Sequence, residues 1–372
     1  MRIIIHFTGC YIEKYGSLER FFCNLINSGN TIGLMHLFVF TKPVNCDEFN
    51  NQLKGKSKIF IASRNKIVRF FQYLFIIYIN KPSIIQTHFD HYDELLALLA
   101  AFLCGIKCRI FTVHIDFFRK KQSILKCIYW ILIKKLTTQF VACGTFVGLQ
   151  IITRLKLPKN KVFMHYFGVE DTIYLPSDRE RIRKELGINN EQIVITCTAF
   201  HSPIKGVDLL LQAYSEIIKK YPNCILLQIG KNPEEHTRKL RLLSEKLGII
   251  DKMRWLGLQN DVPYFLCGTD IYVQPSRTEA LGLAVVEAFS AGLPVITSAV
   301  GGLPELVKNE YNGLLFPKDN VQELVKCLER LILNKTLRMT FGKRNRILYL
   351  NSFESKRQLK VYNTFYQSQT GV

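Results

Sequence analysis

The sequence predicts an α/β protein made of two doubly wound, Rossmann-like domains. Short β-branched runs alternate with helix-length segments through both halves, which is typical of parallel sheets covered by helices on both faces. At 372 residues the chain is too long for most single hydrophobic cores. The alternation lapses at 168–178, so we expect the domain boundary there.

The expected elements follow the alternation along the chain. The opening run RIIIHFT is too short for a signal peptide and predicts the first strand. Further strands of the first half are expected at 33–41, 83–89, 108–114, 139–143 and 161–166, between helices within 17–29, 63–80, 92–104 and 121–135. Strands of the second half are expected at 192–200, 223–230, 252–257, 270–276 and 293–298.

Composition excludes several classes of protein. Hydrophobic residues make up 48% and charged residues 22% of the chain, which is typical of a globular protein and not of a disordered one. The eleven cysteines form no CxxC pair, a pattern that favours reduced thiols in a cytosol over a disulfide framework or a zinc site. No Asp-x-Asp motif and no convincing cluster of metal ligands occurs, so no metal and no cofactor is expected.

The formal charge is +20 and is concentrated in the first half, where residues 1–170 hold 23 Lys and Arg against 9 Asp and Glu. Anionic lipid surfaces, nucleic acids and phosphorylated substrates suit such a charge, and so does an ordinary solvated basic surface. The segments 65–80 and 117–136 are rich in aromatic and basic residues. They are too interrupted to span a membrane, and suit either helices at a lipid interface or core helices covering a sheet.

Two carboxylates, Glu279 and Glu287, stand in an otherwise apolar run, where a buried helix would not readily accept them. In an open α/β sheet, ligands bind beyond the carboxyl ends of the strands, where helix N-termini point outward. The strand DIYVQPS ends at Ser276 and a helix can begin near Gly282, which places Glu279 in the connecting loop. We therefore expect this loop to belong to a ligand site.

The start of the expected helix suits a phosphate or diphosphate. Leu281, Gly282 and Leu283 supply free backbone N–H groups, the helix dipole favours an anion, and glycine permits close approach. Glu287 lies about one and a half turns into the helix, within reach of the same ligand, where a carboxylate can accept the two hydroxyls of a ribose. The alternative is that the carboxylates only complement the helix dipole.

The segment EALGLAVVE (279–287) resembles the E-x7-E motif of the retaining GT-B glycosyltransferases of family four, the glycosyl transferases group 1. The resemblance implies a GT-B fold, in which two Rossmann-like domains face a cleft. Residues 1–170 would be the acceptor-binding domain, 171–350 the domain that binds the nucleotide-sugar donor, and 351–372 a helix that packs back towards the first domain. It also implies that Glu279 holds donor-sugar hydroxyls and that Glu287 binds the ribose.

The run TAFHSPIKGVD resembles the phosphate-binding segment of that family. Lys205 matches the lysine of its lysine-glycine pair, and the resemblance implies that Lys205 neutralises the leaving diphosphate. Phe200 stands where the family carries an arginine. Arg277, beside Glu279, is a candidate for the missing second cation.

Two landmarks of the family fall in the first half. In YGSLERFF, Gly16 matches the loop that contacts the donor and permits a tight turn, whereas Tyr15 replaces the preceding glycine. His114 ends the strand CRIFTVH, where the family often carries a histidine that contacts the donor sugar. His88 is a weaker candidate of the same kind. The alternative for each histidine is a purely structural role.

The resemblance implies a retaining hexosyltransferase, and the absence of a metal-binding motif predicts that it works without a metal. Its expected partners are a nucleotide-sugar donor, a lipid-linked or cell-envelope glycan acceptor and an anionic membrane surface, and its expected location is cytoplasmic, on the inner face of the membrane. Tyr15 and Phe200 favour the alternative of a catalytically inactive GT-B partner or regulatory protein. Binding to nucleic acid is favoured only by charge, because no known nucleic-acid-binding motif occurs, and is not expected.

Overall fold

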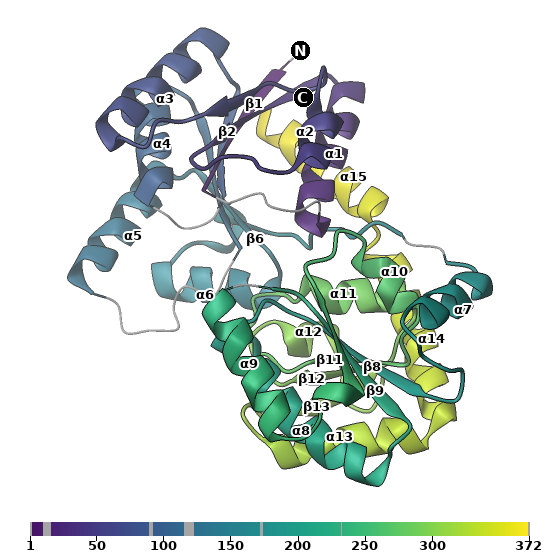
Figure 1. The fold of residues 1–372 in the computed structure, drawn as a ribbon. Coiled ribbons are helices and arrows are strands. Elements are labelled where there is room, and N and C mark those ends of the chain that lie inside the picture. The colour runs from purple at the N-terminus through teal and green to yellow at the C-terminus, as the bar shows by residue number, and fades with distance from the viewer. Residues whose placement is uncertain are drawn as a thin grey trace. The chain divides into compact units, whose positions relative to one another are not determined.

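The computed structural model describes residues 2–9, 16–88, 92–114, 123–171, 174–231 and 233–370. The chain divides into two units, residues 1–168 with 355–372 (unit 1) and residues 169–354 (unit 2). Each unit is a parallel sheet with helices on both faces (Figure 1). The chain therefore passes between the units at 168/169 and at 354/355, whereas the sequence predicted boundaries at 170/171 and 350/351.

Unit 1 contains a seven-stranded sheet in the order β3-β2-β1-β4-β5-β6-β7. Its strands are β1 (Arg2–Thr8), β2 (Leu34–Phe40), β3 (Ile59–Ile61), β4 (Ile84–His88), β5 (Cys108–Val113), β6 (Gln139–Ala142) and β7 (Val162–Met164). Its helices are α1 (Ser17–Thr31), α2 (Asp47–Leu53), α3 (Lys66–Asn80), α4 (Tyr92–Leu103), α5 (Ile124–Leu136), α6 (Thr145–Leu155) and α15 (Ser355–Thr370).

The two faces of this sheet have different chemistry, because successive side chains of a strand point to opposite faces. Ile5 and Phe7 of β1 belong to an apolar cluster with residues of α3 and α4. His6, between them, faces the other way and contacts Phe22 of α1 and Tyr366 of α15. The face beneath α1 and α15 is therefore the one that carries buried polar groups.

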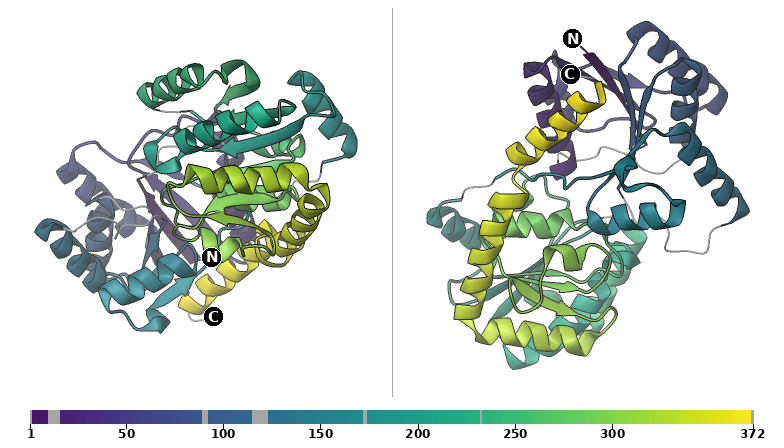
Figure 2. Two further views of the ribbon diagram at one scale, coloured as in Figure 1. Left: turned by 90° about the horizontal axis from the view of Figure 1, so that it is seen from below. Right: turned by 180° about the vertical axis from the view of Figure 1, so that it is seen from behind.

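A buried amide fixes α15 to that polar face. Gln86 of β4 donates to the hydroxyl of Tyr362 at 2.6 Å and accepts a hydrogen bond from the hydroxyl of Tyr366. It also donates to Thr112 of β5 at 2.6 Å. The last helix of the chain thus lies along α1 as part of unit 1, as Figure 2 shows.

Unit 2 contains a six-stranded sheet in the order β10-β9-β8-β11-β12-β13. Its strands are β8 (Ile193–Thr198), β9 (Cys224–Ile229), β10 (Met253–Gly257), β11 (Ile271–Gln274), β12 (Val295–Ser298) and β13 (Gly313–Phe316). Its helices are α7 (Pro176–Glu185), α8 (Val207–Lys220), α9 (Glu234–Lys246), α10 (Val262–Cys267), α11 (Leu283–Ser290), α12 (Leu303–Leu306), α13 (Val321–Leu333) and α14 (Lys335–Ser352).

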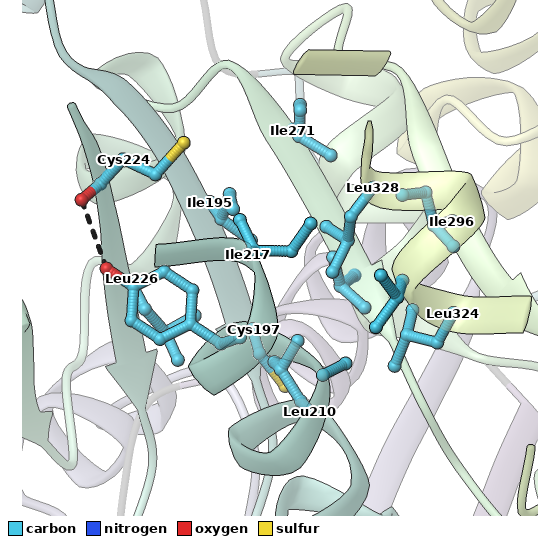
Figure 3. Close-up of a cluster of buried hydrophobic side chains, with 14 of the residues drawn as sticks. Ile195, Cys197, Leu210, Ile217, Cys224, Leu226, Ile271, Ile296, Leu324 and Leu328 are labelled. Carbon is cyan, nitrogen blue, oxygen red and sulfur yellow. Dashed lines mark hydrogen bonds between the residues drawn. The ribbon is translucent and has the colours of Figure 1, made fainter. Parts of the chain in front are cut away.

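The core of unit 2 lies between this sheet and the pair α8 and α13 (Figure 3). Ile195, Ile271 and Ile296 supply the sheet side, while Leu210 and Leu328 supply the helix side. This packing holds β8, β11 and β12 in place, and the loops after these strands start from a rigid base.

Two short strands, β3 and β13, were not predicted. β3 has three residues and β13 has four, which is too few for the alternation of a strand to stand out in a sequence. Pairing with β2 and β12 defines them. They therefore depend on neighbouring strands and not on a local pattern.

We expect Tyr366→Phe to destabilise unit 1, because it leaves the buried oxygen of Gln86 without its donor. An unsatisfied buried acceptor costs about 1–3 kcal/mol. Urea unfolding followed by a unit 1 probe such as Trp130 fluorescence measures the loss. The control is Val361→Ala, at an exposed position of the same helix, and equal stability of the two variants would contradict the role of Gln86.

Candidate functional site

The candidate site of unit 2 lies at the carboxyl edge of its sheet, where β11 leads through a loop into α11. Glu279 lies in this loop, as predicted, and its side chain is only 14% exposed. The Nζ of Lys205 donates to Oε2 of Glu279 at 2.8 Å, and the hydroxyl of Ser276 donates to the same oxygen at 3.2 Å. Within the described chain, no protein group donates a hydrogen bond to Oε1 of Glu279.

A chain of hydrogen bonds between buried polar side chains leads to Glu279. The hydroxyl of Tyr272 donates to Gln274 at 2.8 Å, and the amide of Gln274 donates to Ser276 at 2.9 Å. All three are almost fully buried. They are every second residue of the segment YVQPS, so their side chains lie on one face of the strand. This alternation of polar residues could have predicted them from the sequence.

The start of α11 offers backbone N–H groups. Gly282 precedes the helix with φ +100°, a conformation that favours glycine. In the described part of the chain, no group accepts a hydrogen bond from the N–H of Leu281, Gly282 or Leu283. A methyl group on Gly282 would lie 3.5 Å from Cγ of Glu279, so the carboxylate side chain and the helix start are neighbours.

Glu287 lies on the same helix, half-buried. Burial, the nearby Cys197 and the negative charge of Glu287 together raise the pKa of Tyr272 well above its usual value. Glu287 is therefore close enough to act electrostatically on Tyr272, at the buried end of the hydrogen-bond chain that leads to Glu279.

Arg277 does not supply a free cation. Its guanidinium forms two hydrogen bonds with Asp208, at 2.8 and 2.7 Å, and a third with Asp319 at 2.6 Å. It also donates to the carbonyl of Pro203 at 2.5 Å, and its backbone N–H donates to Ile204 at 2.7 Å. Arg277 therefore fixes the loop that carries Lys205, a role that the sequence did not reveal.

The position that the family fills with an arginine is apolar. Phe200 is 47% exposed. The neighbouring His201 is buried, bonds Thr237 at 2.7 Å and stacks edge-on against Trp255. Burial, with the charge of Arg241, lowers the pKa of His201 to about 4, so His201 is neutral at pH 7 and does not replace the missing cation.

The other predicted residues belong to unit 1. His114 follows β5 at the carboxyl edge of that sheet, stacks on Phe167 and bonds His88 at 3.2 Å. Burial lowers the pKa of His114 to about 3. Gly16 caps α1 with φ −95°, which any residue can adopt, and its N–H donates to Glu19 at 3.0 Å. The loop before Gly16, where the tight turn was expected, lies outside the described residues. Tyr15 lies outside the described residues.

Two further properties bear on the site. In the part of the chain that the structure describes, no group of three or more His, Cys, Asp or Glu side chains could hold a metal ion. No helix in the same part is long and apolar enough to cross a membrane.

The chain is similar in sequence to known glycosyltransferases. Residues 178–347 match the sequence family described as glycosyl transferases group 1. A Haemophilus influenzae protein described as an uncharacterized glycosyltransferase is 35% identical over 145 residues, which are 39% of this chain and 40% of that protein. The Escherichia coli UDP-Gal:alpha-D-GlcNAc-diphosphoundecaprenol alpha-1,3-galactosyltransferase is 28% identical over 277 residues, 72% of this chain and 71% of that protein.

The solved structures show the fold. The Anabaena protein HepE, crystallised with UDP-glucose, matches 99% of this chain and 100% of its own with a TM-score of 0.86 and 18% sequence identity. This chain therefore has the predicted GT-B fold of two parallel-sheet, Rossmann-like domains.

We expect Gly301→Ala to disturb the loop that carries Glu279. A methyl group there would lie 1.8 Å from the carbonyl oxygen of Glu279, at a residue with φ +57°. Gly292→Ala is the matched control, because its φ is +66° but its nearest contacts are 3.8 Å away. The left-handed backbone costs alanine about 1 kcal/mol at both positions, and overpacking adds about 1–3 kcal/mol at Gly301 alone.

Urea unfolding of unit 2 and hydrogen exchange at residues 280–284 measure the two effects. Gly301→Ala should unfold at lower urea than Gly292→Ala and exchange faster in this segment. Equal stability and equal exchange in the two variants would mean that the close approach of Gly301 to Glu279 does not hold the loop.

Proposed function

We propose that this chain, whose residues 178–347 match the family of glycosyl transferases group 1, transfers a sugar from a nucleotide-sugar donor with retention of anomeric configuration. The observation that carries the proposal is the pair of Glu279 and Lys205 beside the unpartnered N–H groups at the start of α11. A carboxylate next to an anion-binding helix start suits a molecule that joins a sugar to a diphosphate.

In this proposal the diphosphate binds at the start of α11. Leu281, Gly282 and Leu283 donate their N–H groups, and the helix dipole adds about half a positive charge. Lys205 supplies a full charge, held in place by Glu279. Removing one such preorganised donor typically lowers a rate by about 100- to 1,000-fold, so these groups can stabilise the leaving diphosphate without a metal.

Glu279 acts on the sugar. Its free Oε1 accepts hydroxyl hydrogen bonds, and its charge stabilises the positive charge that develops at the anomeric carbon. A unit charge about 4 Å away contributes about 4 kcal/mol at an effective dielectric constant near 20, about a thousandfold in rate. Glu287 binds the ribose. The acceptor hydroxyl attacks from the side on which the nucleotide leaves, and the leaving phosphate takes its proton.

For unit 1, the resemblance supports two roles. His114 would contact the donor sugar as a neutral imidazole, since burial keeps its pKa far below 7. Gly16 would contact the donor at the start of α1, although its own N–H is already bonded to Glu19. We propose donor binding by unit 2 and acceptor binding by unit 1.

We further propose that the acceptor is a lipid-linked or cell-envelope glycan and that unit 1 binds an anionic membrane surface. The Escherichia coli relative is named for an undecaprenol-linked substrate. In unit 1, α3, α4 and α5 lie side by side (Figure 1), and each of them exposes large apolar side chains. Those that we call the apolar ridge are Ile67, Phe71, Phe75, Tyr78, Phe102, Leu103, Ile124, Leu125, Ile128 and Ile131.

Charge on the same helices suits anionic lipid. Neither α3 nor α5 contains an Asp or Glu, while exposed lysines such as Lys66, Lys126 and Lys135 flank the apolar ridge. Each such lysine near an anionic surface contributes about 1 kcal/mol. A location on the cytoplasmic face of the membrane follows from this proposal together with the ten described cysteines, all of which are free thiols.

One observation supports the alternative, in which this chain is an inactive GT-B partner. Phe200 is apolar, and Arg277 is occupied by two carboxylates, so neither provides the family's second cation. Calorimetry with UDP-, GDP- and ADP-sugars separates the two, because an active enzyme binds one of these donors and an inactive partner binds none.

We expect Glu279→Gln to lower sugar transfer by about 100-fold or more, because the amide keeps the site's shape but loses the charge. Release of nucleotide from a panel of donors measures it. Glu310→Gln, which removes a surface carboxylate paired with Arg330, should transfer at the wild-type rate. Wild-type turnover by Glu279→Gln would refute its assignment to the reaction.

We expect the double variant Phe71→Ser, Phe75→Ser to lose vesicle binding. The two side chains are 63% and 64% exposed on one face of α3, and burying them in lipid contributes about 1.5 kcal/mol each, together about 100-fold in affinity. Sedimentation with vesicles that contain phosphatidylglycerol measures it. Leu333→Ser, Met339→Ser, at equally exposed positions of unit 2, is the control, and equal losses would argue against the apolar ridge.

A further inference from the structure

A pocket of about 620 Å³ lies in unit 2 at the amino edge of its sheet. Its lining includes Asp270, directly before β11, and Leu293 and Pro294, directly before β12. Residues of α7, α11 and α14 complete it, and these helices are labelled in Figure 1. Glu279 lies beyond the carboxyl end of β11, so the pocket and the candidate site lie at opposite edges of the same sheet.

Three arginines of the pocket are held by backbone carbonyl groups at helix ends. Arg179 donates to carbonyls at and just beyond the end of α10, Arg346 to the last carbonyl of α11, and Arg338 to two carbonyls in the last turn of α13, over 2.6–3.1 Å. A carbonyl fixes a guanidinium group without cancelling its charge. The arginine side chains are therefore in position before any ligand binds.

Two of these arginines are paired with carboxylates. Arg179 donates to Asp270 at 2.6 Å, and Arg346 forms two hydrogen bonds with Asp171, at 2.5 and 2.9 Å. The buried Arg183 donates to the other oxygen of Asp270 at 2.5 Å. The charges on this side of the pocket are therefore largely balanced within the protein.

The start of α14 carries the other two cations of the pocket, Lys335 and Arg338, which lie one turn apart. Neither forms an ion pair in the part of the chain that the structure describes. Arg338 uses only Nη1 for the carbonyls of α13, so its Nε and Nη2 have no acceptor among the described residues. Two unbalanced positive charges are therefore concentrated at one end of the pocket.

A phosphate monoester matches this end better than a carboxylate does. It carries about −1.5 to −2 charges at pH 7, against two positive charges in the pocket. A guanidinium fork can bind two of its oxygens, and an ammonium group can bind the third as a point charge.

The rest of the pocket has room for the body of such an ester. Its volume lies within the range of about 300–1,000 Å³ that is typical of small-molecule sites. Leu175, Leu293 and Met339 supply apolar walls, and the Nε groups of Arg179 and Arg346 have no acceptor in the described chain. A body with an apolar face and several hydroxyls suits these walls, which is the chemistry of a sugar or a nucleoside.

We propose that this pocket binds the phosphate monoester of a small sugar or a nucleoside. The phosphate lies between Lys335 and Arg338, and the body extends along Leu293 and Met339. The pocket shares no residue with the candidate site, so the proposal holds whether or not the chain transfers a sugar.

NMR of protein labelled at its methionine methyl groups tests binding at the pocket itself. Met339 lines the pocket, and the variant Met339→Leu identifies its signal among the five methionines. Uridine monophosphate or glucose 1-phosphate should shift this signal to a plateau, whereas uridine and glucose should leave it in place. A Met339 signal that neither ester moves would overturn the proposal.

A matched pair of substitutions tests the phosphate end. Lys335 and Lys343 are both exposed on α14, but Lys343 does not line the pocket. Lys335→Glu should raise the Kd for the ester by at least about tenfold, because it replaces a charged donor with a like charge. Lys343→Glu makes the same change in net charge and should keep the wild-type Kd. Equal Kd values in the two variants would refute the assignment of the phosphate.

Two further titrations locate the ligand and test its body. Lys205→Ala, at the other edge of the sheet, should leave the Met339 titration unchanged, and a lost response there would place the ligand beside Glu279 and overturn the new site. Inorganic phosphate should bind more weakly than the better ester, because it leaves the apolar walls bare. Equal affinities would refute the role of the body. The tighter of the two esters identifies the body as sugar or nucleoside.

Discussion

The candidate site of unit 2 depends on backbone segments that pack directly against one another at glycines, where a side chain would not fit. A methyl group on Gly301, Gly302 or Gly206 would lie within about 2 Å of the carbonyl oxygens of Glu279, Ala280 and Pro275, respectively. Loops that follow different strands thus touch backbone to backbone. This contact holds Glu279 beside the start of α11 and explains why a segment with two carboxylates continues into glycines.

Unit 1 is subject to a different constraint, because it buries polar side chains on one face of its parallel sheet. Buried polar groups are costly unless they are hydrogen-bonded, and here they bond one another. The Gln86 network with Tyr362 and Tyr366 lies beneath α15, and a histidine row lies on the same face. The rings of this row bond one another in the order His36, His6, His88 and His114. The last helix therefore does more than cover an apolar surface, because its hydroxyls complete the hydrogen bonding of the sheet.

The opposite face of unit 1 shows how one helix can serve two apolar environments. α3 and α5 each bury one side against the unit, through residues such as Tyr73 and Trp130, and expose the other side in the apolar ridge. The two interpretations of these segments from the sequence, core helix and interfacial helix, are therefore compatible. The core packing is observed, and the interfacial role is the proposal that vesicle binding tests.

The sequence by itself determined the two doubly wound units, and it singled out Glu279 and Lys205, which the structure pairs, because alternation, the E-x7-E spacing and the lysine-glycine pair are local patterns. It did not determine what Arg277 does, because its partner Asp208 is 69 residues away. Nor did it reveal the histidine row, whose members are separated by 30, 82 and 26 residues. Register between strands that are distant in the chain is decided by tertiary packing, and only that register places four imidazoles within hydrogen-bond distance.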